Sequence, residues 1–215
     1  MNEEIVSHDF GDGQGQVLAR RHTNGGGYVA LTADVEPTVL VEPEAGVCGS
    51  AQVKGVVRIL DRSRVGGTAV VEELAVLAGD AVVEGACHVD GSAQIYDEAY
   101  LSDAVRIGGN ARIFDQARLT GHCSVTDNAW ISGQAQVSDF ARISGTARIT
   151  GASRISGHVR VSGYAHVAGN AAIEGESRVS GNCTLRGDVR ITDNAEIIGF
   201  VVLDHGVVRA NERRQ

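Results

Sequence analysis

The chain carries an aliphatic residue at every sixth position over most of its length. From Val29 to Leu203, all thirty positions of this series hold Val, Ile or Leu, and no insertion or deletion interrupts it. Two residues before each of them stands a small residue, nearly always Ala, Ser, Cys or Val, with Gly27 as the exception. Two residues after it, most hexads carry Gly or Asp. The repeating unit is therefore small–x–aliphatic–x–Gly/Asp–x.

Each hexad predicts a very short strand followed by a corner. Side chains alternate along a strand, so the aliphatic residue points inward and its two neighbours point outward. Gly and Asp adopt the unusual backbone angles of a tight corner at low cost. One hexad cannot bury its own aliphatic side chain, so successive turns of the chain must stack on one another.

This pattern resembles the hexapeptide-repeat, left-handed parallel β-helix family, and the likeness covers residues 27–205. It implies an all-β fold, a single-stranded left-handed parallel β-helix of about ten triangular coils with three hexads each. At ~4.8 Å per coil the prism is about 48 Å long. More narrowly, residues 24–30 (NGGGYVA) are similar to poorly characterised bacterial and phage repeat proteins, which carry a Gly-Gly-aromatic-Val segment before the first coil.

The two ends of the chain depart from the repeat. We expect residues 1–26 to form an N-terminal cap segment, residues 27–205 the β-helix and residues 206–215 a C-terminal tail. The glycines at positions 11, 13 and 15 lack the flanking strand, the helix and the Lys-Ser/Thr pair of a phosphate loop. They are therefore assigned to the cap.

Composition fits a narrow prism and argues against several classes of protein. With 28 Gly, a single Met and 4% aromatic residues, the chain has few large core fillers. No apolar run approaches the roughly 20 residues of a membrane helix, and the acidic start has no apolar stretch after it, so we expect a cytoplasmic protein. A net charge of −8 makes nucleic acid an unfavourable partner. The four cysteines show no metal-ligand spacing, so we expect no metal site.

Residues eighteen apart should stack on one face, and one face gathers large apolar side chains at outward positions. These residues, called the apolar stripe below, are Leu40, Leu60, Val76, Tyr96, Phe114 and Trp130. A continuous exposed stripe usually marks an interface. We therefore expect a homo-oligomer, and the family resemblance implies a trimer. The alternative is that the N-terminal segment folds back over the stripe.

Arginine concentrates at the outward position just before the aliphatic residue, which holds eleven of the eighteen arginines. Three consecutive coils of one face repeat Arg-x-Ser, in the pairs Arg142 and Ser144, Arg160 and Ser162, and Arg178 and Ser180. Stacked guanidinium groups repel one another unless an anion lies between them, and with neighbouring hydroxyls they can hold phosphate or carboxylate. The pattern predicts a site for a small anionic ligand or polymer. The commoner alternative is a solvated polar face whose long side chains cover apolar surface.

The resemblance also implies an enzymatic alternative. Many hexapeptide-repeat proteins are acyl- or acetyltransferases that use coenzyme A or an acyl carrier protein and a histidine as general base. His122 and His158, stacked two coils apart on one corner with Phe140 between them, are the candidates for that base. Such enzymes usually interrupt their coils with a loop or add a domain, and no loop interrupts the thirty hexads here. We therefore predict a rigid, non-catalytic structural or binding module without a cofactor, and keep the acyltransferase as the alternative.

The cysteines divide into two groups by their place in the hexad. Cys87, Cys123 and Cys183 occupy the small position, where they replace Ala, so buried and inert thiols are expected. Cys48 stands at an outward position. That position makes its thiol a candidate for reaction, although no neighbour in the sequence obviously lowers its pKa.

Overall fold

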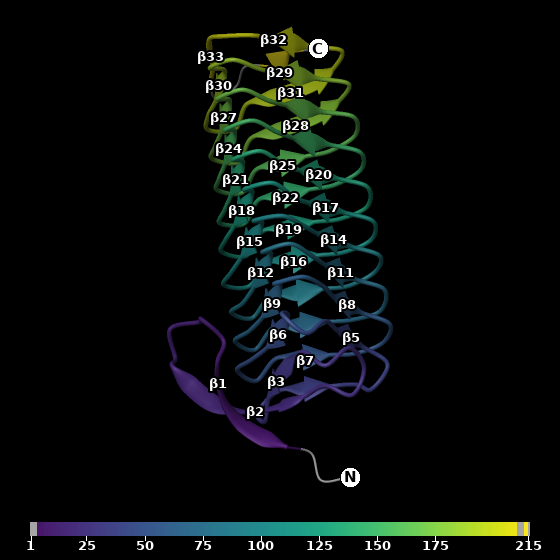
Figure 1. Cartoon of the computed structure of the whole chain (residues 1–215). Helices are drawn as coiled ribbons and strands as arrows, with labels where there is room; N and C mark the ends of the chain where they lie inside the picture. The colour runs from purple at the N-terminus through teal and green to yellow at the C-terminus, as the bar shows by residue number, and fades with distance from the viewer. Residues whose placement is uncertain (1–3, 210–212, 215) are drawn as a thin grey trace.

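The computed structural model describes residues 4–209, 213 and 214, which form strands and turns but no helix. From β3 onward the chain winds into a parallel β-helix with three lengthwise sheets, called faces A, B and C below (Figure 1). Strands pair in parallel with partners eighteen residues away, as Val82 does with Tyr100. The prediction of an all-β parallel β-helix with about ten coils of three hexads is confirmed.

Face A holds the first and the longest of the three stacks. Its strands in the β-helix are β3 (Tyr28–Ala30), β6 (Gly46–Val47), β9 (Arg64–Val65), β12 (Val82–Val83), β15 (Tyr100–Leu101), β18 (Arg118–Leu119), β21 (Gln136–Val137), β24 (Arg154–Ile155), β27 (Ala172–Ile173), β30 (Arg190–Ile191) and β33 (Val207–Val208). Two antiparallel strands, β1 (Ile5–Asp9) and β2 (Gln16–Arg21), extend this sheet at its N-terminal end.

Faces B and C take the second and third strand of each coil. Face B consists of β4 (Asp34–Val35), β7 (Gln52–Val53), β10 (Val70–Val71), β13 (His88–Val89), β16 (Arg106–Ile107), β19 (Ser124–Val125), β22 (Arg142–Ile143), β25 (Arg160–Val161), β28 (Arg178–Gly181), β31 (Glu196–Gly199) and β34 (Arg213–Arg214). Face C consists of β5 (Leu40–Val41), β8 (Arg58–Ile59), β11 (Val76–Leu77), β14 (Gln94–Ile95), β17 (Arg112–Ile113), β20 (Trp130–Ile131), β23 (Arg148–Ile149), β26 (His166–Val167), β29 (Thr184–Leu185) and β32 (Val202–Leu203).

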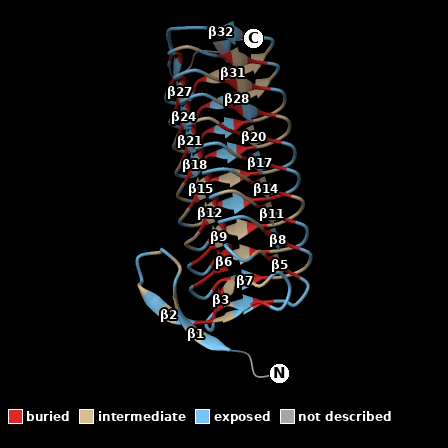
Figure 2. Ribbon diagram, in the orientation of Figure 1, coloured by how far each residue is buried: buried red, intermediate tan, exposed pale blue. Residues whose placement is uncertain are grey.

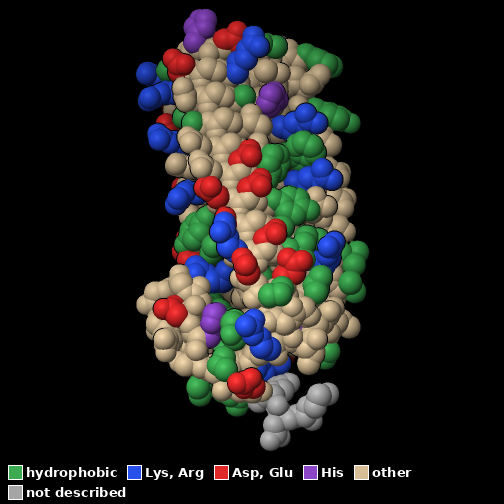
Figure 3. All heavy atoms as spheres, viewed as in Figure 1, with side chains coloured by type: hydrophobic (Ala, Val, Ile, Leu, Met, Phe, Trp, Pro, Cys, Tyr) green, Lys and Arg blue, Asp and Glu red, His purple; other side chains and the backbone are tan. Residues whose placement is uncertain are grey.

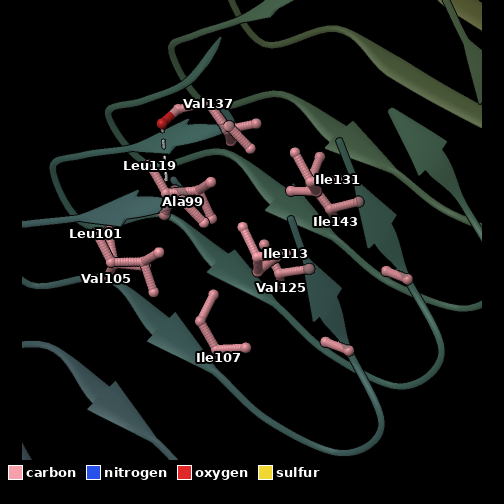
Figure 4. Close-up of a cluster of buried hydrophobic side chains, with 14 of the residues drawn as sticks. Ala99, Leu101, Val105, Ile107, Ile113, Leu119, Val125, Ile131, Val137 and Ile143 are labelled. Carbon is pink, nitrogen blue, oxygen red and sulfur yellow. Dashed lines mark hydrogen bonds between the residues drawn. The ribbon is translucent and has the colours of Figure 1, made fainter. Parts of the chain in front are cut away.

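The aliphatic series fills the inside of the prism, as predicted. From Val29 to Ile197 no member of the series exposes more than 6% of its surface, and buried positions recur in every coil (Figure 2). The side chains stack in columns, for example Leu101, Leu119 and Val137 along face A (Figure 4). Each coil thus buries its apolar side chains against its neighbours, so stability arises from many small contacts between coils.

Aspartate at the corners has a second role that the repeat alone does not reveal. Asp115 has a left-handed backbone with φ 57°, and its carboxylate accepts a hydrogen bond of 2.8 Å from the backbone N–H of Gly133 in the next coil. The same bond joins Asp103 to Gly121. The other corners that repeat it start at Asp61, Glu73, Asp97, Asp127 and Asp139. Acidic residues therefore hold successive corners together.

The hairpin of β1 and β2 packs on face A. The ring of Phe10, in the loop between the two strands, lies against Gly46, and the Phe10 carbonyl accepts a hydrogen bond of 2.9 Å from Nη1 of Arg64. His8 stacks on Tyr28 with ring centroids 3.8 Å apart. The N-terminal hairpin therefore lies on face A and not along the apolar stripe, while Gly25 packs against Leu40 at the first coil of face C.

The sheets continue past residue 205, into the segment expected as a tail. β33 pairs with β30 and β34 pairs with β31. Here the spacing falls by one residue, because Ile191 lies opposite Val208 rather than residue 209. Val208 is buried, with 3% of its surface exposed. The short last coil explains why the six-residue series stops at Leu203.

Candidate functional site

The three arginines of the predicted anion site form a straight column on face B, called the arginine ladder below. Arg142 on β22 lies opposite Arg160 on β25, which lies opposite Arg178 on β28. All three side chains are exposed. Neighbouring strands of a sheet lie about 4.8 Å apart, so three positive charges follow one another along the axis of the prism.

The ladder lacks the acidic partners that Arg62, Arg64 and Arg186 have. Arg62 pairs with Asp80 of the next coil, with Nη2 and Oδ2 2.6 Å apart, and Arg186 pairs with Asp204 in the same way. Within the described part of the chain, the three ladder side chains form no hydrogen bond and no ion pair. Stacked like charges without a counter-ion repel one another, so an anion that lay between them would relieve a repulsion the fold leaves in place.

A column of serines runs beside the ladder. Ser144, Ser162 and Ser180 stand two residues after each arginine and are partly exposed. Their backbone N–H groups bond the next coil, as Ser144 does to the carbonyl of Val161, but their hydroxyls bond no other described atom. Each hydroxyl can therefore donate to and accept from a ligand beside the guanidinium groups.

The two candidate histidines occupy the corner that leads into face B. The ring of Phe140 stacks between those of His122 and His158, with centroids 5.2 and 4.8 Å apart and interplanar angles of 25° and 2°. This corner stack confirms the predicted order of the three residues. Because His158 precedes Arg160 by two residues, the corner stack borders the arginine ladder.

A shallow hollow joins the two candidate groups. It measures ≈ 350 Å³ and is lined by His158, Arg160, Glu176 and Arg178. Two guanidinium groups and an imidazole thus surround one open space, with a single carboxylate at its edge. The arrangement favours an anion. The sequence pattern assigns Arg160 and Arg178 to the anion site and His158 to a separate candidate, and it does not indicate Glu176.

The geometry provides little for a general base. A catalytic histidine is normally oriented by a carboxylate or carbonyl that accepts from its second nitrogen. His88 has such a partner, with Nε2 2.8 Å from Oε1 of Glu72. No such hydrogen bond is present at His122 or His158 among the described residues. Nor do the described residues bring three or more His, Cys, Asp or Glu side chains together at a metal site.

The thiols of all four cysteines are buried. This confirms the prediction for Cys87, Cys123 and Cys183, and burial raises the pKa of Cys123 to about 12. The prediction for Cys48 is wrong: it exposes 0% of its surface, because the loop after β1 covers its outward position. Burial, and Asp12 beside it, raise the pKa of the Cys48 thiol to about 12. A reactive thiol at this place is excluded by the fold.

The six residues of the apolar stripe all lie on face C, and each is partly exposed. Along this side of the molecule hydrophobic and basic side chains alternate (Figure 3). Trp130 sits between Arg112 and Arg148, whose guanidinium carbons lie 5.2 and 4.9 Å from its ring centroid, and Phe114 meets it edge-on at 6.0 Å. The sequence indicated the stripe but not this arginine–tryptophan sandwich, although Arg112 and Arg148 stand eighteen residues on either side of Trp130.

No family model matches the chain, and no curated protein matches it either. In the described residues there is no helix with the length and apolar character needed to cross a membrane.

Proposed function

We propose that this protein is a rigid, non-catalytic β-helical scaffold that binds an anionic ligand on face B. One observation carries the proposal: three arginines stand in register on consecutive coils and form no ion pair with any described residue. Guanidinium groups bind phosphate and carboxylate through paired N–H donors, and adjacent hydroxyls add further hydrogen bonds. The thirty unbroken hexads support membership of the hexapeptide-repeat, left-handed β-helix family.

Calorimetric titration with tripolyphosphate at low salt tests the proposal. The wild-type protein should bind it, and Arg160→Gln, which removes the middle of the ladder, should weaken binding about tenfold. Arg154→Gln is the matched control, because Arg154 holds the same hexad position on face A between Gln136 and Ala172. Equal losses in both variants, or no binding by the wild type, would contradict an anion site on face B.

We propose further that the apolar stripe joins copies of the chain, as a trimer if the family pattern holds. The stripe is partly exposed on face C, while the N-terminal hairpin lies on face A. Tryptophan, tyrosine and arginine are the residues that dominate the energetics of protein interfaces, and the sandwich around Trp130 supplies two of these types. A scaffold with face C paired would still leave face B open to its ligand.

An acyltransferase that uses coenzyme A is the second candidate. The hollow favours it in one respect, because it brings the imidazole of His158 beside two guanidinium groups that could hold the phosphates of such a cofactor. Thermal shift with acetyl-coenzyme A, followed by release of free thiol in the presence of amine acceptors, tests this candidate. Turnover that is lost in His158→Ala but kept in His166→Ala would replace the scaffold proposal with the enzymatic one.

A further inference from the structure

The basic part of face B is longer than the arginine ladder. Arg106 on β16 and Ser124 on β19 stand in the same column, so four of the five outward positions from β16 to β28 are arginine. Before them the same column holds Val70 on β10 and His88 on β13, with Glu72 and Asp90 in the neighbouring column. The column ends in Glu196 on β31. Face B therefore has one basic segment of five strands, interrupted at Ser124 and about 19 Å long at ~4.8 Å per strand.

This segment is an open, straight track. The pairing advances by eighteen residues at every step from Arg106 to Arg178, so the column keeps to one line along the prism. All four arginines are exposed, and the hollow of ≈ 350 Å³ touches only the last two of them. A small anion can neutralise one or two of these charges. A chain with an anionic group on each successive unit neutralises them all.

Hydroxyl groups accompany the track from β19 to β28, while the position beside Arg106 holds Gly108. Thr126 precedes Ser144, Ser162 and Ser180 in the column beside the ladder, and its hydroxyl, like theirs, bonds no other described atom. Hydroxyl groups both donate and accept, so they match the many hydroxyls of a sugar backbone. A hexose unit advances a polysaccharide chain by a distance close to the strand spacing. The track thus offers charge and hydrogen bonding at the same repeat.

Nucleic acid fits the track less well. Proteins that hold single strands stack the bases on exposed aromatic faces. In the corner stack both faces of Phe140 are covered by His122 and His158, which leaves ring edges toward solvent. In duplex DNA each strand presents one phosphate per ~3.4 Å of axis, a shorter repeat than the ~4.8 Å of the strands. The chain also carries a net charge of −8.

We infer that face B binds a linear acidic polysaccharide, laid parallel to the axis of the prism with its carboxylate or sulfate groups on successive arginines. The inference rests on the proposed anion site and names the class of its ligand. The contacts run from Arg106 to Arg178, with the hydroxyls of the neighbouring column bonding the sugar units. Face B would then hold a polymer along the five strands from β16 to β28 of a rigid rod.

A length series tests the inference. Fluorescence anisotropy measures the affinity for galacturonate oligomers of one to eight units (carboxylate), heparin-derived oligomers (sulfate) and oligo-dT of matched length. The affinity for at least one of the sugar series should rise more than tenfold from monomer to tetramer and level off once the track is spanned. Arg160→Gln should weaken tetramer binding about tenfold, while Arg154→Gln on face A should not.

The outcomes separate this inference from the proposed anion site. If tripolyphosphate binds at the ladder but neither sugar series gains affinity with length, the polysaccharide inference is overturned and the anion site stands. If oligo-dT binds more tightly than both sugar series, the polymer is a nucleic acid and the inference is overturned. If no anion of any kind binds, the proposed function fails together with it.

Discussion

The ring of Phe10 lies so close to the bare backbone of Gly46 that a Cβ atom at residue 46 would stand 2.9 Å from its Cδ1 atom. The same loop places Asp12 beside the buried thiol of Cys48. We expect Gly46→Val to push the loop off face A and expose this thiol. The rate of maleimide modification at Cys48 in native buffer should therefore rise by an order of magnitude or more.

Ala172→Val is the control for that experiment. Ala172 holds the same hexad position on face A, on β27, seven strands along the sheet from the loop. Its added bulk should leave the modification rate of Cys48 unchanged. A wild-type rate in Gly46→Val would show that the loop does not cover face A as described.

Corner aspartates should contribute measurably to stability. Asp115→Ala removes the hydrogen bond to Gly133 and places a methyl side chain on a left-handed backbone, so we expect a loss of about 2 kcal/mol. Asp115→Gly loses the bond without the strain and should cost about half as much. Asp115→Asn keeps an acceptor and tolerates the backbone, so its loss should be smallest. Urea unfolding midpoints in that order support the account, and an Asp115→Ala midpoint equal to wild type would contradict it.

The buried thiols should make the fold sensitive to alkali. Burial raises the pKa of Cys87 from 9.0 to about 11 and that of Cys123 to about 12. The pKa of each thiol is higher in the folded protein than in the unfolded one. The free energy of unfolding is therefore at its full value below pH 9 and falls as the pH rises from 9 toward 12. Each thiol then costs up to about 1.4 kcal/mol per pH unit over its own interval.

The double variant Cys87→Ala/Cys123→Ala tests this pH dependence, because Ala is the usual residue at that position of the hexad. Its melting temperature should lie near that of wild type at pH 7 and above it at pH 10.5. Parallel curves of melting temperature against pH for the two proteins would show that the thiols are not titrating from a buried state.

The apolar stripe predicts a charge-sensitive assembly. Val76→Glu places a carboxylate in the middle of the stripe on face C, and should shift the protein to monomer in sedimentation velocity at micromolar concentration. Val82→Glu is the matched control, because Val82 holds the same hexad position on the next strand, β12 of face A, and is also partly exposed. A wild-type protein that sediments as a monomer would rule out the interface.

Much of this structure follows from a single repeat in the sequence. Because no residue is inserted or lost between Val29 and Leu203, the six-residue series predicts every inward residue. The resemblance adds three hexads per coil, which predicts the contents of each face and the order of the corner stack. In such a fold each coil contacts only its neighbours along the chain, so the sequence position of a residue determines its coil and its face.

The six-residue repeat could not predict the loop that covers part of face A, the hydrogen bonds at the corners or the short last coil. Gly46, Cys48 and Gly66 are small residues at three nearby outward positions of face A, and this run was the available signal that another segment covers the surface there. The hydrogen bonds of the corner aspartates depend on side-chain direction, which a spacing does not contain. The short last coil depends on a pairing that shifts by one residue at Val208.

The most direct test of the account is to locate bound anion on the surface. In protein labelled with ¹⁵N-arginine, the Nε–Hε signals can be assigned with single Arg→Gln variants and followed during titration with tripolyphosphate. We predict that the signals of Arg142, Arg160 and Arg178 shift together and saturably, while that of Arg154 on face A stays in place. Shifts confined to Arg112 and Arg148 of face C, or equal small shifts at every arginine, would contradict a binding site on face B.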